Sequence, residues 1–491
     1  MTWVRCMPWP RLTWWVAETA RAAGAVPPCP HPVTMNRRSH APRLRLPGLM
    51  AAAACLLLSA VDGEAASPRQ VFAHYMVCFA TYGESVEAYR REMQEAQAAG
   101  IDGFALNVGA WSGADTYYKR RVALLYQAAA GLGNRFTLFF SIDLTNATDV
   151  VDMVSTYAFH PASFRHQDRL VLSTFGGNDI PSRGLPGVDW GGEVFPALSS
   201  RGIKVCFLPY FWPDPVTELP TYADANRLFD RYGGLVDGLF YFGAAGLPSR
   251  LAASNADYAR AARERGRLFM ASVAPHYWGL NQAVAGRRYY EFQGPEGLAL
   301  QWGSILASRP DWVEIVTWND WNEGTYVAPV DDPARWNAGL QPPRRHPHAG
   351  YLEFSRRYIQ WYKSGVEPAI DRDALFCSYR THPMGIAPVP GTDMPVDRRI
   401  GDVQDLIYTT IVATEPAELR ITSGGIATTN AVPAGVTHWR TRFWPGAQSF
   451  LLTRQGRTAL SWDGPPVMSR VERYNFFPTT GFAYGAPVKP R

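Results

Sequence analysis

Residues 312–326 read WVEIVTWNDWNEGTY, and this stretch predicts a buried strand followed at once by a cluster of polar side chains. The segment 312–317 is largely apolar and β-branched, as strands in protein interiors are. Residues 318–326 then present two carboxylates, two amides and three large aromatic rings. Aromatic faces beside amide and carboxylate groups suit a sugar ring, and two acids are the minimum for glycoside hydrolysis. The alternative is an aromatic-rich turn whose acids cap the following helix.

Seven further apolar runs precede this strand and alternate with helical patterns. They are Val71–Phe79, Gly103–Gly109, Thr137–Asp143, Arg169–Gly177, Lys204–Trp212, Gly238–Ala244 and Leu268–Tyr277. Eight strand–helix units predict an α/β fold, a (β/α)8 TIM-type barrel, and continuously apolar runs fit strands covered on both faces. An open doubly wound sheet is the alternative, but the sequence lacks the phosphate-binding glycine loop that would favour it.

The pattern changes after a helix expected at about 350–364. Short strand-like segments separated by Gly and Pro turns predict a small C-terminal antiparallel β-sandwich. We expect the (β/α)8 barrel to span 67–370, a Pro- and Gly-rich linker 371–395, and the β-sandwich 396–491.

The N-terminal region has the pattern of a secretory signal. Basic residues follow Met35, the apolar segment Leu46–Val61 comes next, and Gly63–Ala65 is a plausible cleavage site. We therefore expect residues 1–34 to precede the true translation start and residues 35–66 to be a signal peptide. The mature chain should be secreted or periplasmic, with no stable membrane insertion.

Composition excludes several classes of function. The 491 residues are 47% hydrophobic and 19% charged, as in an ordinary soluble protein, and the net charge of +5 gives no basic face for nucleic acid. Three cysteines remain after processing, an odd number without a pairing or zinc-binding spacing. We expect no metal, no cofactor and a monomer. The 17 tryptophans and 23 tyrosines fit a carbohydrate-handling surface.

Five stretches together resemble family 71 of the glycoside hydrolases, the α-1,3-glucanases also called mutanases. They are VFAHYM at 71–76, AGIDGFALN at 99–107, LFFSID at 138–143, STFGG at 173–177 and WNDWNEGTY at 318–326. The similarity continues through YRTHP at 379–383 and covers nearly all of the mature chain. It implies a secreted enzyme that cleaves α-1,3-glucosidic bonds in a polysaccharide.

The sequence also departs from the family pattern. Fungal members tend to read WNDYGES where this chain has WNDWNEG, and Gln301 stands before Trp302 where arginine is more frequent. The Asp-x-x-Glu spacing is kept. The sequence of residues 318–325 also resembles that of the family 99 endo-α-mannosidases, so an α-mannan or mixed α-glucan hydrolase is an alternative. A catalytically silent carbohydrate-binding protein is another, although both acids are present.

The resemblance implies that Asp320 and Glu323 are the catalytic pair and that hydrolysis inverts the anomeric configuration. Two acids in one partly apolar site repel each other's charge, which separates their pKa values and their roles. We assign Glu323 as the acid and Asp320 as the base. Inversion requires about 6.5–9.5 Å between the carboxyl groups. An extended chain would provide this gap, whereas a helical turn would bring the groups closer.

Eleven further residues are predicted to bind substrate. They are His74, Tyr75, Asn107, Asp143, Trp212, His276, Tyr277, Trp302, Trp318, Asn319 and Tyr326. Asp143 is the third candidate carboxylate, and its alternative role is a helix N-cap that Asn146 could also fill. The histidines and aromatics have core packing as their alternative.

Overall fold

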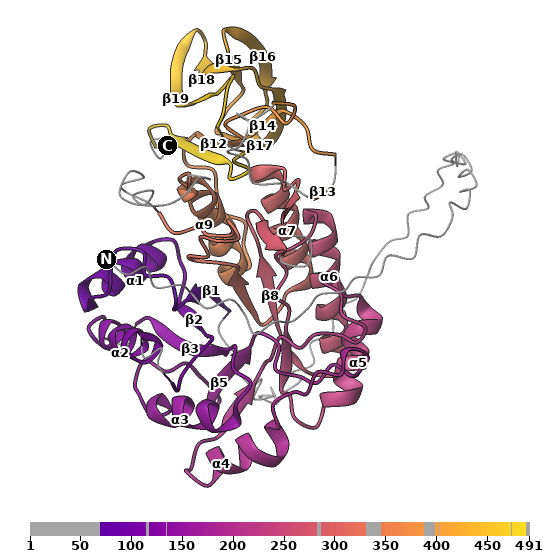
Figure 1. Cartoon of the computed structure of the whole chain (residues 1–491). Coiled ribbons are helices and arrows are strands. Elements are labelled where there is room, and N and C mark those ends of the chain that lie inside the picture. Colours follow the sequence, from indigo (N-terminus) through magenta and orange to yellow (C-terminus); the bar gives the residue numbers. More distant parts are fainter. Residues whose placement is uncertain are drawn as a thin grey trace, which may run out of the picture. The chain divides into compact units, whose positions relative to one another are not determined.

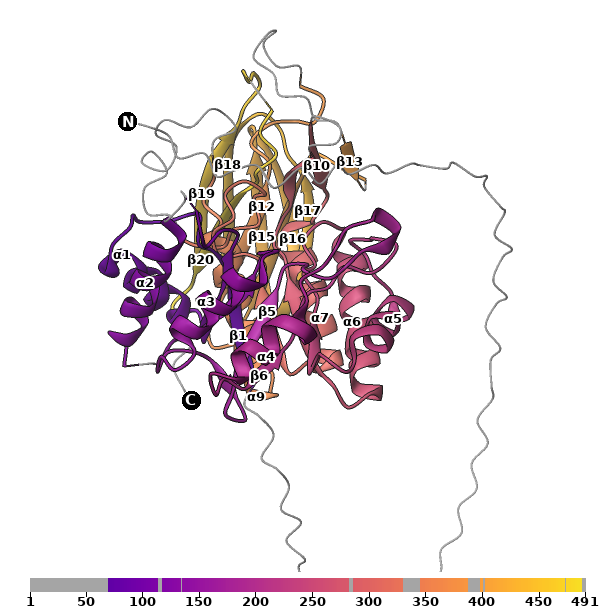
Figure 2. The ribbon, with the colours of Figure 1, turned by 60° about the horizontal axis from the view of Figure 1, so that its bottom comes forward.

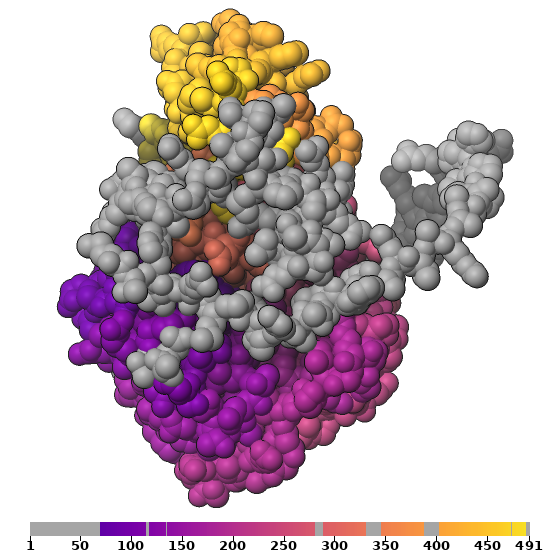
Figure 3. All heavy atoms as spheres, in the orientation of Figure 1, coloured from indigo at the N-terminus to yellow at the C-terminus, as the bar shows by residue number. Residues whose placement is uncertain are grey.

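The computed structural model describes residues 69–113, 117–133, 135–281, 286–329, 345–386, 398–400, 402–472 and 474–487; the other residues are grey in Figure 3. The predicted segments 1–34 and 35–66 therefore lie outside the described residues, as do residues 387–395 of the predicted linker. In the described part of the chain, no helix is long and apolar enough to cross a membrane.

A curled parallel sheet forms the first part of the fold (Figure 1). Its order is β7 (Gly238–Phe240), β8 (Leu268–Val273), β11 (Trp312–Ile315), β1 (Gln70–Met76), β2 (Gly103–Val108), β3 (Thr137–Ile142), β5 (Arg169–Thr174) and β6 (Val205–Phe207), with β4 (Arg165–His166) antiparallel to β5. Each predicted apolar run coincides with one parallel strand. At the two ends of this order, Asp237 N donates to Phe207 O (2.9 Å) and Phe240 N to Pro209 O (3.0 Å), without a paired ladder between β6 and β7.

Helices flank the sheet on two sides. They are α1 (Val86–Ala98), α2 (Tyr117–Ala130), α3 (Ala147–Tyr157), α4 (Phe195–Ser199), α5 (Tyr222–Tyr232), α6 (Pro248–Glu264), α7 (Gly294–Ser308) and α9 (Ala349–Ser364). Figures 1 and 2 show α1–α3 beside β1–β3 and α5–α7 on the other flank. Local sequence fixes their starts: the side chains of Ser85 and Asn146 cap α1 and α3. The fold is thus mixed α/β.

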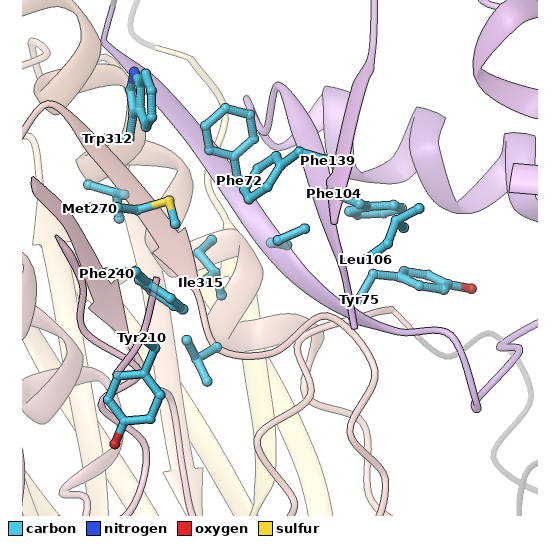
Figure 4. Close-up of a cluster of buried hydrophobic side chains, with 14 of the residues drawn as sticks. Phe72, Tyr75, Phe104, Leu106, Phe139, Tyr210, Phe240, Met270, Trp312 and Ile315 are labelled. Carbon is cyan, nitrogen blue, oxygen red and sulfur yellow. The ribbon is translucent and has the colours of Figure 1, made fainter. Parts of the chain in front are cut away.

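The side chains of β1 alternate between the two faces of the sheet. Phe72 packs against Phe139 and Trp312, with ring centroids 4.9 and 6.3 Å apart. Tyr75 has the opposite parity and lies beside Phe104 at 4.8 Å (Figure 4). Because side chains alternate along a strand, His74 shares the face of Phe72, and Tyr75 points toward the helices.

The C-terminal part contains two four-stranded antiparallel sheets. One has the order β17 (Gly435–Arg442), β14 (Leu406–Ala413), β12 (Ala374–Tyr379), β20 (Thr479–Tyr484); the other is β16 (Ile426–Val432), β15 (Ala417–Ser423), β18 (Gly446–Arg454), β19 (Arg457–Val467). Leu375, Ile411, Leu419 and Phe450 from both sheets share one hydrophobic cluster. β12 falls within the predicted linker, yet it is a central strand that pairs with β14 on one side and β20 on the other. All six of its residues are buried.

A small third sheet follows β8 and bears on the site. It joins β9 (Trp278–Asn281) and β10 (Gly286–Tyr290) as an antiparallel pair, with β13 (Arg398–Ile400) parallel to β10. Trp278 and Tyr289 from this sheet form a hydrophobic cluster with Phe476 and Phe477, which precede β20.

Candidate active site

The segment after β11 folds back on itself and is tied at both ends. Thr317 N donates to Thr325 O (3.0 Å), and the hydroxyls of these two threonines lie 3.0 Å apart. Residues 321–324 form a turn in which Gly324 N reaches Asp320 O (3.2 Å). Asp320 and Glu323 thus lie on one short, closed turn, and the chain between them is not extended.

Trp318 and Asn319 attach this turn to β1 and α1. Trp318 N donates to His74 O (2.7 Å), and its indole Nε1 donates to Glu92 Oε2 (2.8 Å). Asn319 Oδ1 accepts from Met76 N (2.7 Å), while its amide nitrogen donates to Met76 O (3.1 Å). Both side chains are fully buried. They position the turn and have no surface with which to touch a sugar.

Asp320 is nearly buried, with 8% of its surface exposed. Its Oδ1 accepts from the backbone N–H groups of Asn322 and Glu323, both at 2.9 Å. Burial raises the pKa of Asp320, whereas these two amides and the charges of His74 and Arg345 act in the opposite direction. Asp320 thus binds backbone N–H groups, as the alternative prediction of a helix-capping acid requires. The residues that follow it, however, form a turn and not a helix.

His74 is held by a carboxylate that the sequence analysis did not single out. His74 Nδ1 lies 2.6 Å from Glu314 Oε1, and both side chains are buried. Glu314 shares the inward parity of Trp312 on β11. Burial raises the pKa of Glu314, and the bond to His74 opposes this. This pair fixes the orientation of the imidazole near Asp320.

Glu323 is half-buried and is held by residues that follow β8. Trp278 N donates to its carbonyl (2.7 Å), and Tyr277 Oη donates to Glu323 Oε1 (3.1 Å). Burial and the nearby charge of Asp320 raise the pKa of Glu323 to about 8. A carboxyl with such a pKa carries its proton at neutral pH. The two acids therefore differ in the way that acid and base roles require.

Three predicted residues lie at or after the carboxyl ends of strands in the sheet that contains β11. Asp143 follows β3 and is half-buried; burial raises its pKa to about 8, and the bond with the buried Asn107 opposes this. Asn146, not Asp143, caps α3, which leaves Asp143 free of the capping role. Trp212, after β6, is half-buried beside Phe175 and Tyr210.

Nine of the eleven residues predicted to bind substrate have at most 4% of their surface exposed, so packing is their observed role and substrate contact stays a prediction: His74, Tyr75, Asn107, His276, Tyr277, Trp302, Trp318, Asn319 and Tyr326. Tyr75 donates to Glu92 (3.0 Å) on the helix side of β1. Trp302 lies on α7 and donates to Ser355 of α9 (3.2 Å). Tyr326 stacks on His348 at 4.1 Å. His276 packs among aromatic rings, and burial lowers its pKa well below the ordinary value.

Several polar residues of the site were missed. Glu92 accepts from Tyr75, Thr81 and Trp318, and burial raises its pKa to about 7. Its position on the apolar face of α1, beside Tyr89 and Met93, was a usable signal. No sequence signal pointed to Arg288, which bonds Tyr277, or to Glu218, which bonds Arg288.

The described ranges contain histidines, acids and cysteines, which are the usual metal ligands. Within them, no group of three or more His, Cys, Asp or Glu side chains could hold a metal ion. Cys206 and Cys377 are buried free thiols. The groups gathered at the end of β11 are thus carboxyls, a phenol and an imidazole, which transfer protons.

Comparison with known families decides what kind of protein carries this pair of acids. Residues 67–488 match the model of glycosyl hydrolase family 71. The chain belongs to glycosyl hydrolase family 71. The predicted family is therefore confirmed, and the protein is a glycoside hydrolase.

Relatives of this family 71 protein cover almost its whole described length. It is 27% identical over 443 residues to glucan endo-1,3-alpha-glucosidase agn1 of Schizosaccharomyces pombe, covering 87% of this chain and 98% of the relative. It is also 27% identical over 443 residues to a mutanase of Penicillium rubens, covering 86% and 91%. Among solved structures, a GH99 endo-alpha-mannosidase from Bacteroides thetaiotaomicron is similar with a TM-score of 0.44 and 15% identity, covering 60% of this chain and 98% of that one.

Proposed function

We propose that this family 71 protein hydrolyses α-1,3-glucosidic bonds in a polysaccharide, with Glu323 as general acid and Asp320 as general base. The observation that carries this proposal is the unequal environment of two acids on one turn. Glu323 has a pKa raised to about 8 by burial and by Asp320. Asp320 accepts two backbone N–H groups, which favour its ionised form. The relatives named as endo-1,3-alpha-glucosidase and mutanase support an α-1,3-glucan as substrate.

In the proposed step Glu323 gives its proton to the glycosidic oxygen as the bond from that oxygen to the anomeric carbon breaks. Asp320 takes a proton from a water molecule that attacks the anomeric carbon from the opposite face, which inverts its configuration. The turn shortens the chain between the acids, but their side chains are held by different partners. Asp320 bonds the amides of its own turn, whereas Glu323 bonds Tyr277.

The surrounding groups have supporting roles in this proposal. His74, held by Glu314, lies near Asp320. Asp143 with Asn107, and Trp212, are the proposed contacts to substrate hydroxyls and ring faces. We also propose that the curled sheet is a (β/α)8 barrel, that the two C-terminal sheets form a β-sandwich, and that residues 35–66 direct export of a monomeric mature enzyme.

An α-mannan or mixed α-glucan hydrolase is the second candidate. It is favoured by the resemblance of the sequence at 318–325 to the family 99 endo-α-mannosidases. Incubation of the purified protein with α-1,3-glucan, mixed α-glucan and α-mannan, followed by NMR of the released sugar, separates the candidates. Release of β-anomeric product from α-1,3-glucan alone is expected. Release of the α-anomer refutes inversion, and release only from mannan refutes the substrate. Binding without hydrolysis identifies a silent carbohydrate-binding protein.

A further inference from the structure

A chain of polar contacts leads away from Glu323 through two residues to a second carboxylate. Tyr277 Oη donates to Glu323 Oε1 (3.1 Å), and Arg288 Nη2 donates to Tyr277 Oη (3.1 Å). The other arm of the guanidinium, Nη1, bonds Glu218 Oε2 (2.6 Å). The three partners come from the loop after β8, strand β10 and the segment before α5; Tyr277 and Arg288 are 11 residues apart, whereas Glu218 is 70 residues from Arg288. Arg288 and Glu218 are partly buried.

The chemistry of these groups fixes the direction of each bond. A guanidinium has only N–H donors, so the Tyr277 oxygen must accept from Arg288. The single phenolic hydrogen is then available for Glu323 Oε1. The carbonyl oxygen of a carboxylic acid is the better acceptor, so the bond from Tyr277 to Oε1 favours Oε2 as the oxygen that carries the proton of Glu323. The contacts thus favour Oε2 as the oxygen that delivers the proton.

We propose that Arg288 and Tyr277 are positioning residues that keep the proton of Glu323 on Oε2, and that Glu218 balances the charge of Arg288. This inference rests on the proposed function and deepens it. When the proton leaves Oε2 for the glycosidic oxygen, the electron pair of the breaking bond stays with that oxygen. Glu323 becomes an anion, and its bond from Tyr277 becomes charge-assisted and stronger. The relay therefore favours the state that forms as the bond breaks.

The charges around Glu323 make the relay testable through pH dependence. Asp320 and Glu218 raise the pKa of Glu323, whereas Arg288 and the Tyr277 bond lower it. His276, which packs under Gly324, is kept neutral by burial. Arg345 acts on the neighbouring Asp320. Removal of Arg288 or of Glu218 should thus shift the pKa of Glu323 in opposite directions.

The decisive variant is Tyr277→Phe, which removes one hydroxyl and keeps the ring. Its kcat on α-1,3-glucan should fall about 10-fold to 100-fold, as for loss of assistance to an acid. Its kcat on an α-1,3-linked oligosaccharyl fluoride should stay within about threefold, because fluoride leaves without a full proton transfer. Tyr379→Phe is the matched control: Tyr379 Oη bonds the backbone carbonyl of Pro465 (2.8 Å) and bonds no member of the relay. This control should retain wild-type kcat on both substrates.

The pH profiles of Arg288→Gln and Glu218→Gln complete the test. The alkaline limb of kcat/KM should move to higher pH in Arg288→Gln and to lower pH in Glu218→Gln. Limbs that move together or not at all, or equal losses on glucan and fluoride in Tyr277→Phe, overturn the relay. A wild-type protein that releases no sugar from α-1,3-glucan refutes the proposed function instead. In that case the relay is tested by the same profiles on the α-glycan that the protein does cleave.

Discussion

Replacing Gly324 with alanine is expected to distort the turn that carries both candidate acids. Gly324 has φ of +73°, a left-handed conformation that costs an L-residue about 1–2 kcal/mol. An added Cβ would lie 2.4 Å from Phe477 Cε1 and 3.2 Å from His276 Cδ2. Overpacking of this kind costs a further ~1–3 kcal/mol. Together these effects predict a loss of about 2–5 kcal/mol in unfolding free energy.

Activity should fall as well. Because Phe477 is buried, relief of the clash between its ring and the added methyl group should displace the turn. A displacement near 1 Å of a catalytic group lowers kcat by about 100-fold. The matched control is Gly303→Ala on α7. A methyl group there would meet no atom within 4 Å, so helix propensity should stabilise this variant by about 1 kcal/mol.

The assay compares thermal midpoint and kcat on α-1,3-glucan for the two alanine variants and wild type. The midpoints should move in opposite directions, with kcat unchanged only in Gly303→Ala. A Gly324→Ala protein with wild-type midpoint and kcat would show that the turn tolerates the methyl group, and the steric reasoning would be refuted.

The remaining predictions concern the acids and one buried carboxyl. Asp320→Asn and Glu323→Gln should each lose hydrolysis and keep the circular dichroism spectrum of wild type; full activity in either removes that residue from the mechanism. For wild type, kcat/KM should fall above pH of about 8 as Glu323 ionises. It should also fall at acid pH as Asp320 becomes protonated, at a pH above the ordinary aspartate range; a flat profile across both limbs contradicts the assignment. The folded-state pKa of Glu92, about 7, lies above the ordinary value of 4.5, so its contribution to stability is complete below pH 4.5 and is lost as pH rises to 7. At about 1.4 kcal/mol per pH unit, the unfolding free energy of wild type should fall by about 3 kcal/mol between pH 4.5 and pH 7. Denaturation of Glu92→Gln at the same two pH values should not show this fall.

The strands were predictable because each is a continuous apolar run, which is what burial on both faces requires. The C-terminal boundary was harder. The strand β12 stands in a region rich in proline and glycine, and only its pairing with β14 and β20 shows that it belongs to the sheet. Short strands next to turns carry little local signal of which partners they will find.

The acids were predictable from the motif, but the roles of their neighbours were not. Alternation along β1 could have shown that His74 and Tyr75 point to opposite faces. Glu314 inside an apolar strand was likewise a visible signal of a buried pair. Arg288 and Glu218 are 70 residues apart in sequence, and only the fold brings them together beside Tyr277. A local sequence pattern cannot predict a contact between residues so far apart in the chain.

The contact between Phe477 and Gly324 joins two regions that are remote along the chain. Phe477 lies two residues before β20, an outer strand of a C-terminal sheet, and the carbonyl oxygen of its neighbour Pro478 lies 3.1 Å from His348 Nε2. The segment that leads into the last strand therefore packs against the turn that carries the two candidate acids. Replacing the C-terminal sheets with another domain would therefore also remove Phe477, which packs against the turn that carries the candidate acids.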